Sequence, residues 1–189
     1  MTPVTISEEY FPEVVLNRVP KLNEQPTPVS TPYDAIDYVS RFLQRYTIEN
    51  LIMITFDNAC MPLNYSIISR GTIDKAMVST QDIVKTMLLS NATGCILLHN
   101  HARNDSVTGK PHPSKSDIDV TFDVQRALSL FRLRLIDMII VGPDGSLTSF
   151  LEDNIGVFKA MHEMVEKKKE QLASKNIASE NVASKNTDA

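Results

Sequence analysis

The segment CILLHNH, residues 95–101, restricts the possible folds of this chain more than any other stretch. It is a short apolar run that ends in polar residues, and STQDIVKTMLLSNATG before it carries apolar residues at helical spacing. A short apolar run beside helical patterns is typical of a strand buried inside a sheet that helices cover. Because another helical pattern starts at Ser114, we predict a mixed α/β or α+β fold, with a mixed sheet flanked by helices.

Further elements are predicted on both sides of this strand. Thr31 can cap a helix that begins at Pro32, since proline suits the first helical position. Strands are predicted at residues 50–57 and 63–72, and these two could form a hairpin. A third helix is predicted at residues 114–133. Residues 134–150 are then predicted to form two strands around the turn GPDG.

Composition divides the chain into four segments. We predict an N-terminal strand and a Pro-rich linker over residues 1–31, because the prolines of PKLNEQPTPVSTP resist regular structure. The main domain follows over residues 32–153, and the apolar spacing in IGVFKAMHEMVEKKKEQL predicts a helix over residues 154–172. The units ASKNI, ASENV and ASKNT then predict a disordered tail over residues 173–189, because small polar residues bury too little apolar surface to order a chain.

Composition also weighs against several classes of function. The formal net charge is −4 and no dense basic run is present except EKKKEQ near the end, which does not favour nucleic-acid binding. Cys60 and Cys95 match no metal knuckle or redox motif, and the start of the chain lacks a signal-peptide pattern, so we expect a reduced, cytoplasmic protein. No apolar run approaches the ~20 residues that span a membrane. Homo-oligomerisation through exposed sheet edges is left open.

The histidines suggest a metal site. His99 and His101 are two residues apart at a strand end, and the alternation of side chains along a strand places both on the same face. A helix that starts beside this strand end would bring Asp117 toward them. Two imidazoles and one carboxylate can hold a tetrahedral Zn²⁺ with one open position. Each part also has a structural reading, since HxH pairs arise by chance, and Ser114 with Asp117 has the spacing of a helix N-cap and its third-position acid.

The order of these features resembles the JAB/MPN metalloprotease domain, in its RadC-like branch. The resemblance is carried by TFDN, SRGTID, VSTQDIVKTMLLSNATGCILLHNH, SKSDID and RLIDMIIVGPDGSLTSF, which together span most of the predicted domain. It implies a cytidine-deaminase-like mixed sheet and a zinc ion bound by His99, His101 and Asp117. It also implies that the Ser114 hydroxyl hydrogen-bonds the reacting water or the oxyanion, and that a glutamate from an earlier strand is the general acid and base.

Two departures from the family pattern lie in the loop after the histidines. Ala102 stands where the family has a proline. The loop before Ser114 is longer than the family's and contains VTGKPH, which makes His112 a possible additional metal ligand.

A third departure concerns the catalytic glutamate. Ser66 stands at its expected position, five residues before Gly71, and no glutamate lies between residues 50 and 151. Serine is not a base near neutral pH, and general acid–base catalysis contributes about 10²- to 10⁴-fold. Asp57, Asp105 and His112 are possible substitutes, although none has a spacing that argues for it.

Two functions of different classes follow. The first is zinc-dependent hydrolysis of peptide or isopeptide bonds by a metallopeptidase that uses the two histidines, Asp117 and Ser114. The second is a metal-binding interaction module, associated with mobile elements, whose catalysis is impaired by Ser66. In both cases we expect a peptide or protein partner, which the sequence does not identify, and no membrane. Nucleic acid is disfavoured as a partner by the net charge but is left open.

Overall fold

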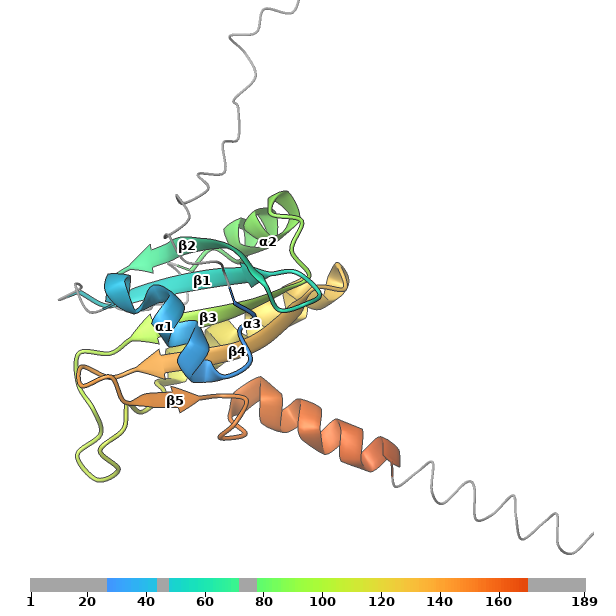
Figure 1. Cartoon of the computed structure of the whole chain (residues 1–189). Helices are drawn as coiled ribbons and strands as arrows, with labels where there is room; N and C mark the ends of the chain where they lie inside the picture. Colours follow the sequence, from blue (N-terminus) through green and yellow to red (C-terminus); the bar gives the residue numbers. More distant parts are fainter. Residues whose placement is uncertain (1–26, 44–47, 72–77, 170–189) are drawn as a thin grey trace, which may run out of the picture.

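The computed structural model describes residues 27–43, 48–71 and 78–169. The helices and strands with assigned bounds are, in chain order, α1 (Pro32–Leu43), β1 (Asn50–Phe56), β2 (Pro62–Arg70), α2 (Thr80–Leu89), β3 (Gly94–Asn100), α3 (Lys115–Leu130), β4 (Arg134–Val141) and β5 (Leu147–Ser149). Residues 156–169 form a further helix. Figure 1 shows this last helix pointing away from the sheet.

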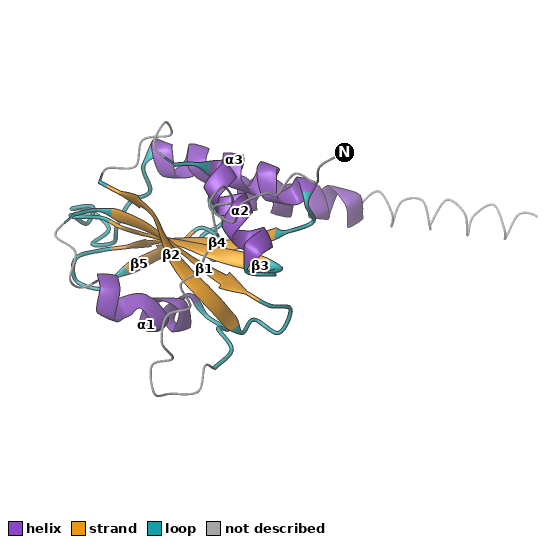
Figure 2. Cartoon of the chain, turned by 90° about the horizontal axis from the view of Figure 1, so that it is seen from above, coloured by secondary structure: helices purple, strands orange, loops and turns teal. Residues whose placement is uncertain are grey.

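The five described strands form one mixed sheet in the order β2-β1-β3-β4-β5. β1 is antiparallel to both β2 and β3, β4 is antiparallel to β5, and β3 and β4 are parallel. A parallel pair needs a crossover connection, which contains α3 here. Helix α1 lies on one face of the sheet, and α2 and α3 lie on the other (Figure 2). The predicted mixed sheet flanked by helices is therefore confirmed.

Strand β3 lies between β1 and β4 and is buried on both faces. Leu97 belongs to the apolar cluster that includes Val124 of α3, whereas Leu98 belongs to the cluster that includes Ala35 of α1. Because side chains alternate along a strand, the side chain two residues after Leu97 also faces α3. The fold thus directs His99 toward that helix.

Some predicted segments fall outside the described residues. The N-terminal strand predicted within residues 1–31 and the tail predicted over residues 173–189 lie outside them, apart from residues 27–31. The helix predicted over residues 154–172 is helical at residues 156–169, and residues 170–172 lie outside. Among the described residues, no helix combines the length and the apolar character that crossing a membrane requires.

Asp137 is a buried acid that joins β4 to the end of β5. Its Oδ1 accepts hydrogen bonds from the backbone N–H groups of Met138 at 2.7 Å and Leu151 at 2.9 Å, and its Oδ2 accepts one from the Ser149 hydroxyl at 2.6 Å. Burial raises the pKa of Asp137 to about 6, although these hydrogen bonds oppose the rise and the charge of Glu152 adds to it. The carboxyl therefore holds its proton more firmly in the folded chain than in the unfolded chain.

Replacing Asp137 by asparagine is expected to remove a pH dependence from folding stability. Between about pH 4 and pH 6, the Asp137 carboxyl is ionised in the unfolded chain but still protonated in the folded chain. The free energy of unfolding therefore falls as the pH rises through this window. For a rise in pKa from 3.8 to about 6, the loss is about 3 kcal/mol. Urea unfolding at acid and neutral pH should show this extra loss in wild type relative to Asp137→Asn. Parallel pH profiles for the two proteins would contradict it.

Candidate metal centre

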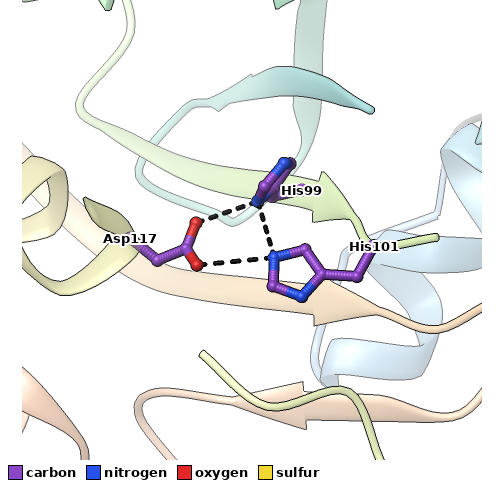
Figure 3. A group of neighbouring side chains, drawn as sticks. All are labelled: His99, His101 and Asp117. Atoms are coloured by element: carbon purple, nitrogen blue, oxygen red, sulfur yellow. Dashed lines mark hydrogen bonds and ion pairs between the residues drawn. The ribbon is translucent and has the colours of Figure 1, made fainter. Parts of the chain in front are cut away.

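Strand β3 brings two histidines to one point (Figure 3). His99 is buried near the end of β3, and His101 follows the last residue of the strand and is partly buried. Their rings lie edge to face, with centroids 4.6 Å apart and an interplanar angle of 85°. Nε2 of His101 lies 3.1 Å from Nδ1 of His99. The two imidazoles therefore converge on the same side of the strand, as their spacing predicts.

Helix α3 brings a carboxylate to the same point. Ser114 is the N-cap of α3: its hydroxyl accepts the N–H of Asp117, and Oδ2 of Asp117 accepts the N–H of Ser114 at 2.7 Å. The same carboxylate reaches β3, since Oδ1 lies 2.9 Å from Nδ1 of His99 and Oδ2 lies 3.4 Å from Nε2 of His101. The structural and the metal-binding interpretations of SKSD are therefore compatible, because the cap holds the carboxylate in front of the histidines.

These three side chains could hold a metal ion. In a tetrahedral zinc site with bonds of about 2.1 Å, neighbouring ligand atoms lie about 3.4 Å apart. Here Nδ1 of His99 lies 3.1 Å from Nε2 of His101, while Oδ1 of Asp117 lies 2.9 Å from the former nitrogen and Oδ2 lies 3.4 Å from the latter. Among the described residues, His99, His101 and Asp117 form a group of His, Cys, Asp or Glu side chains whose ligand atoms all lie within 4.8 Å of one another. The donor types therefore suit a zinc ion, and the three side chains are close enough together to share one.

The charge of Asp117 also suits a metal ligand. Burial alone would raise the pKa of its carboxyl. Hydrogen bonds with His101 and His99, the charge of His99 and the hydroxyl of Ser114 outweigh burial and hold the pKa of Asp117 well below its usual range. The carboxylate is therefore ionised, which is the form that binds metals.

A second carboxylate, absent from the sequence prediction, lies beside His99. Oε2 of Glu49 is 3.9 Å from Nε2 of His99, and the Glu49 side chain is 26% exposed whereas that of His99 is 2% exposed. Within the described part of the chain, Nε2 of His99 is buried and has no hydrogen-bond partner. Glu49 directly precedes β1, the strand that pairs with β3, and so falls one residue outside the 50–151 segment that contains no glutamate.

Ser66, expected at the glutamate position, lies elsewhere in the sheet. It is on β2, where it pairs with Met53 of β1, and β1 separates β2 from β3. Asp57 and Asp105 accept backbone N–H groups of the turns that follow them. Glu49, rather than any of these side chains, is the acid that the structure places next to Nε2 of the first histidine.

The long loop over residues 102–113 is fastened to the β4–β5 hairpin. The Thr148 hydroxyl donates a buried hydrogen bond to the carbonyl oxygen of Pro111 at 2.7 Å. Nδ2 of Asn104 donates to the Ser146 hydroxyl at 3.1 Å. The sequence departure that lengthens this loop therefore adds chain along the edge of the sheet where β5 lies.

His112, the possible additional ligand, is exposed on this loop. It lines a cavity of about 300 Å³ together with Lys110 and Ile118. It is not among the side chains whose ligand atoms gather at the metal group. The structure therefore brings together three of the four side chains considered as ligands.

Comparison with known proteins assigns the chain to a family. The model of the RadC-like JAB domain matches residues 29–155. The chain belongs to this family. A UPF0758 protein of Pseudomonas entomophila strain L48 is 33% identical over 129 residues, which cover 68% of this chain and 54% of that protein. A UPF0758 protein of Cellvibrio japonicus strain Ueda107 is 35% identical over 124 residues, which cover 66% of this chain and 53% of that protein.

The chain spans about half the length of the curated relatives that it matches. In this RadC-like JAB domain, the histidines and the aspartate of the HNH and SKSD segments form the group that could bind a metal ion. Ala102, in place of the family's proline, is compatible with this geometry, since both histidine rings contact Asp117.

Proposed function

We propose that this RadC-like JAB domain is a zinc-dependent hydrolase of peptide or isopeptide bonds. The observation that carries the proposal is the group of His99, His101 and Asp117, whose ligand atoms lie within 4.8 Å of one another, with His99 and Asp117 buried. When bound there, zinc supplies a Lewis acid that polarises a carbonyl and lowers the pKa of water to about 7. His99, His101 and Asp117 would hold the ion.

Glu49 is the general acid and base of this proposal. Its carboxylate lies beside His99 without a hydrogen bond to it, because 3.9 Å exceeds hydrogen-bonding distance. The carboxylate takes a proton from the attacking water and delivers it to the nitrogen of the leaving amine, so that the C–N bond breaks without forming an amide anion. Its partial exposure gives water and substrate access to the carboxylate.

Ser114 has two parts in the proposal. Its hydroxyl donates to Oδ2 of Asp117 at 2.6 Å, which steadies the carboxylate that binds the ion. When its hydrogen turns away from Asp117, the same hydroxyl donates to the oxyanion that forms on the substrate carbonyl. The cap thus couples the start of α3 to the reacting centre.

The alternative is a metal-binding interaction module whose catalysis is impaired because Ser66 stands at the glutamate position. Glu49 supplies the carboxylate that this alternative took to be absent. We therefore favour the hydrolase. The partner that we propose is a peptide or protein that carries the scissile amide bond.

A chelation experiment tests the hydrolase. The zinc-loaded protein is incubated with linear peptide probes and with lysine-linked isopeptide probes. Cleavage of at least one class is expected, with loss after 1,10-phenanthroline and recovery when zinc is restored. Cleavage that persists through chelation would contradict the proposal, as would the lack of cleavage of both classes at zinc saturation.

A further inference from the structure

Asn100, which lies between the two histidines, holds the backbone on both sides of Glu49. Its Oδ1 accepts the backbone N–H of Asn50 at 2.8 Å. Its Nδ2 donates to the backbone carbonyl of Ile48 at 3.2 Å. One side chain of β3 therefore binds the residue before Glu49 and the residue after it.

The geometry of the sheet explains why a side chain is needed there. The ladder between β1 and β3 ends at the pair Leu51 and His99. Beyond that pair, the backbone of β3 continues to pair with β4, and the N–H of His101 donates to the carbonyl of Val141 at 2.8 Å. The amide of Asn100 carries the same donor and acceptor as a peptide group, so it extends the hydrogen bonding between β1 and β3 by one step.

Other contacts fix the same short segment. Nδ2 of Asn50 donates to the carbonyl of Ile48 at 2.6 Å. The N–H of Gly71, at the end of β2, donates to the carbonyl of Glu49 at 2.7 Å. The backbone of Glu49 is thus held from β2 on one side and from β3 on the other, which limits the positions that its carboxylate can take beside His99.

We propose that Asn100 is a positioning residue for Glu49. The inference rests on the proposed role of Glu49 as general acid and base. The tripeptide His99–Asn100–His101 then has two roles. The two histidine side chains supply metal ligands on one face of the strand, and the side chain of Asn100 between them holds the segment that carries Glu49. The relative placement of base and metal ligands is built into three consecutive residues.

The first test needs no turnover. In Asn100→Ala, the Asn50 amide loses its acceptor, so its hydrogen exchange should be at least about tenfold faster than in wild type, measured by NMR on the zinc-free full chain. A crystal structure of the variant should show the Glu49 carboxylate displaced from His99 or in several positions. Unchanged exchange at Asn50 with Glu49 in its original position would overturn the proposal.

The second test asks whether the position of Glu49 is used in catalysis. A misplaced catalytic group costs up to about 10²-fold, so Asn100→Ala should lower kcat by about 10- to 100-fold. KM and zinc content should stay near wild type. In the Glu49→Gln background, Asn100→Ala should have no further effect on kcat. An equal loss in both backgrounds, or zinc loss that parallels the loss of activity, would overturn the positioning role.

Gln125→Ala is the matched control. The Gln125 side chain accepts the backbone N–H of Leu135 at 3.3 Å and so also joins two elements, but it lies on α3 near the start of β4, away from the histidines. It should leave kcat and the exchange of Asn50 unchanged. Failure of the hydrolase proposal has a different signature: wild type would cleave no probe, while the exchange and the crystal structure would still decide whether Asn100 positions Glu49.

Discussion

Replacing Glu49 by glutamine is expected to lower kcat for amide hydrolysis by about 10²- to 10⁴-fold, which is the usual contribution of a positioned general acid or base. Glutamine has nearly the same shape but takes no proton from water. The three metal ligands are unchanged in this variant, so zinc should remain at about one per chain. Steady-state kinetics on the best peptide or isopeptide probe, together with metal analysis of the same preparation, measures both quantities.

Ser66→Ala is the matched control, because Ser66 stands at the glutamate position that the family resemblance implies. Its place on β2, with β1 between it and the histidines, predicts an unchanged kcat. If Ser66→Ala were as impaired as Glu49→Gln, the role assigned to Glu49 would be wrong. Loss of zinc from Glu49→Gln would instead make Glu49 a support of His99 rather than the general base.

Asp117→Asn should weaken zinc binding by more than about 100-fold. Losing a residue that only supports a metal ligand costs up to about 100-fold in affinity, and Asp117 is proposed to bind the metal itself. Asparagine has the size of the aspartate and can still accept the N–H of Ser114, so the helix cap is largely retained. It lacks the negative charge that the buried carboxylate directs at the two histidines. Competition with a chromophoric chelator measures the dissociation constant.

Asp82→Asn makes the same change at the corresponding position of α2. The N–H of Asp82 bonds to the hydroxyl of Ser79 at 3.1 Å, as the N–H of Asp117 bonds to that of Ser114. Asp82 forms an exposed pair with Lys85 and lies outside the metal group. Its replacement should leave zinc affinity unchanged. Equal affinities in wild type and Asp117→Asn would remove Asp117 from the ligand set.

Local patterns point to the histidine–aspartate group, and the resemblance to the family favours this interpretation over the structural one. The apolar run of β3 marks a buried strand, and the two-residue spacing places both histidines on one side of it. The N-cap pattern of SKSD locates the start of α3 and therefore Asp117. These are short-range consequences of strand and helix geometry, which a sequence displays directly.

The place of Glu49 could not be predicted in this way. It depends on the register between β1 and β3, in which Leu51 pairs with His99, and on the side chain of Asn100 beyond the last pair. Register between strands separated by some fifty residues is a property of the whole sheet and leaves no local mark. The family pattern places the glutamate five residues before Gly71, on the same strand, which gives Ser66. In the folded chain, the backbone N–H of Gly71 instead bonds to Glu49, which directly precedes the neighbouring strand β1.

The contacts of the long loop were also beyond the sequence. Its composition indicates a loop, but its attachment to the β4–β5 hairpin depends on Asn104 and Pro111 meeting Ser146 and Thr148, residues far along the chain. His112 is predicted as a possible ligand because the lengthened loop could bring its side chain to the metal. The attachment leaves it exposed beside Lys110 instead.

The most direct test of the metal centre is the zinc content of the wild-type protein. The chain is purified without chelators, incubated with a small excess of zinc, desalted and analysed by plasma mass spectrometry against its protein concentration. About one zinc per chain is expected, as for a site with three protein ligands, and Asp117→Asn treated in parallel should retain almost none. A wild-type protein that retains no zinc after this treatment would contradict the metal centre and the hydrolase built on it.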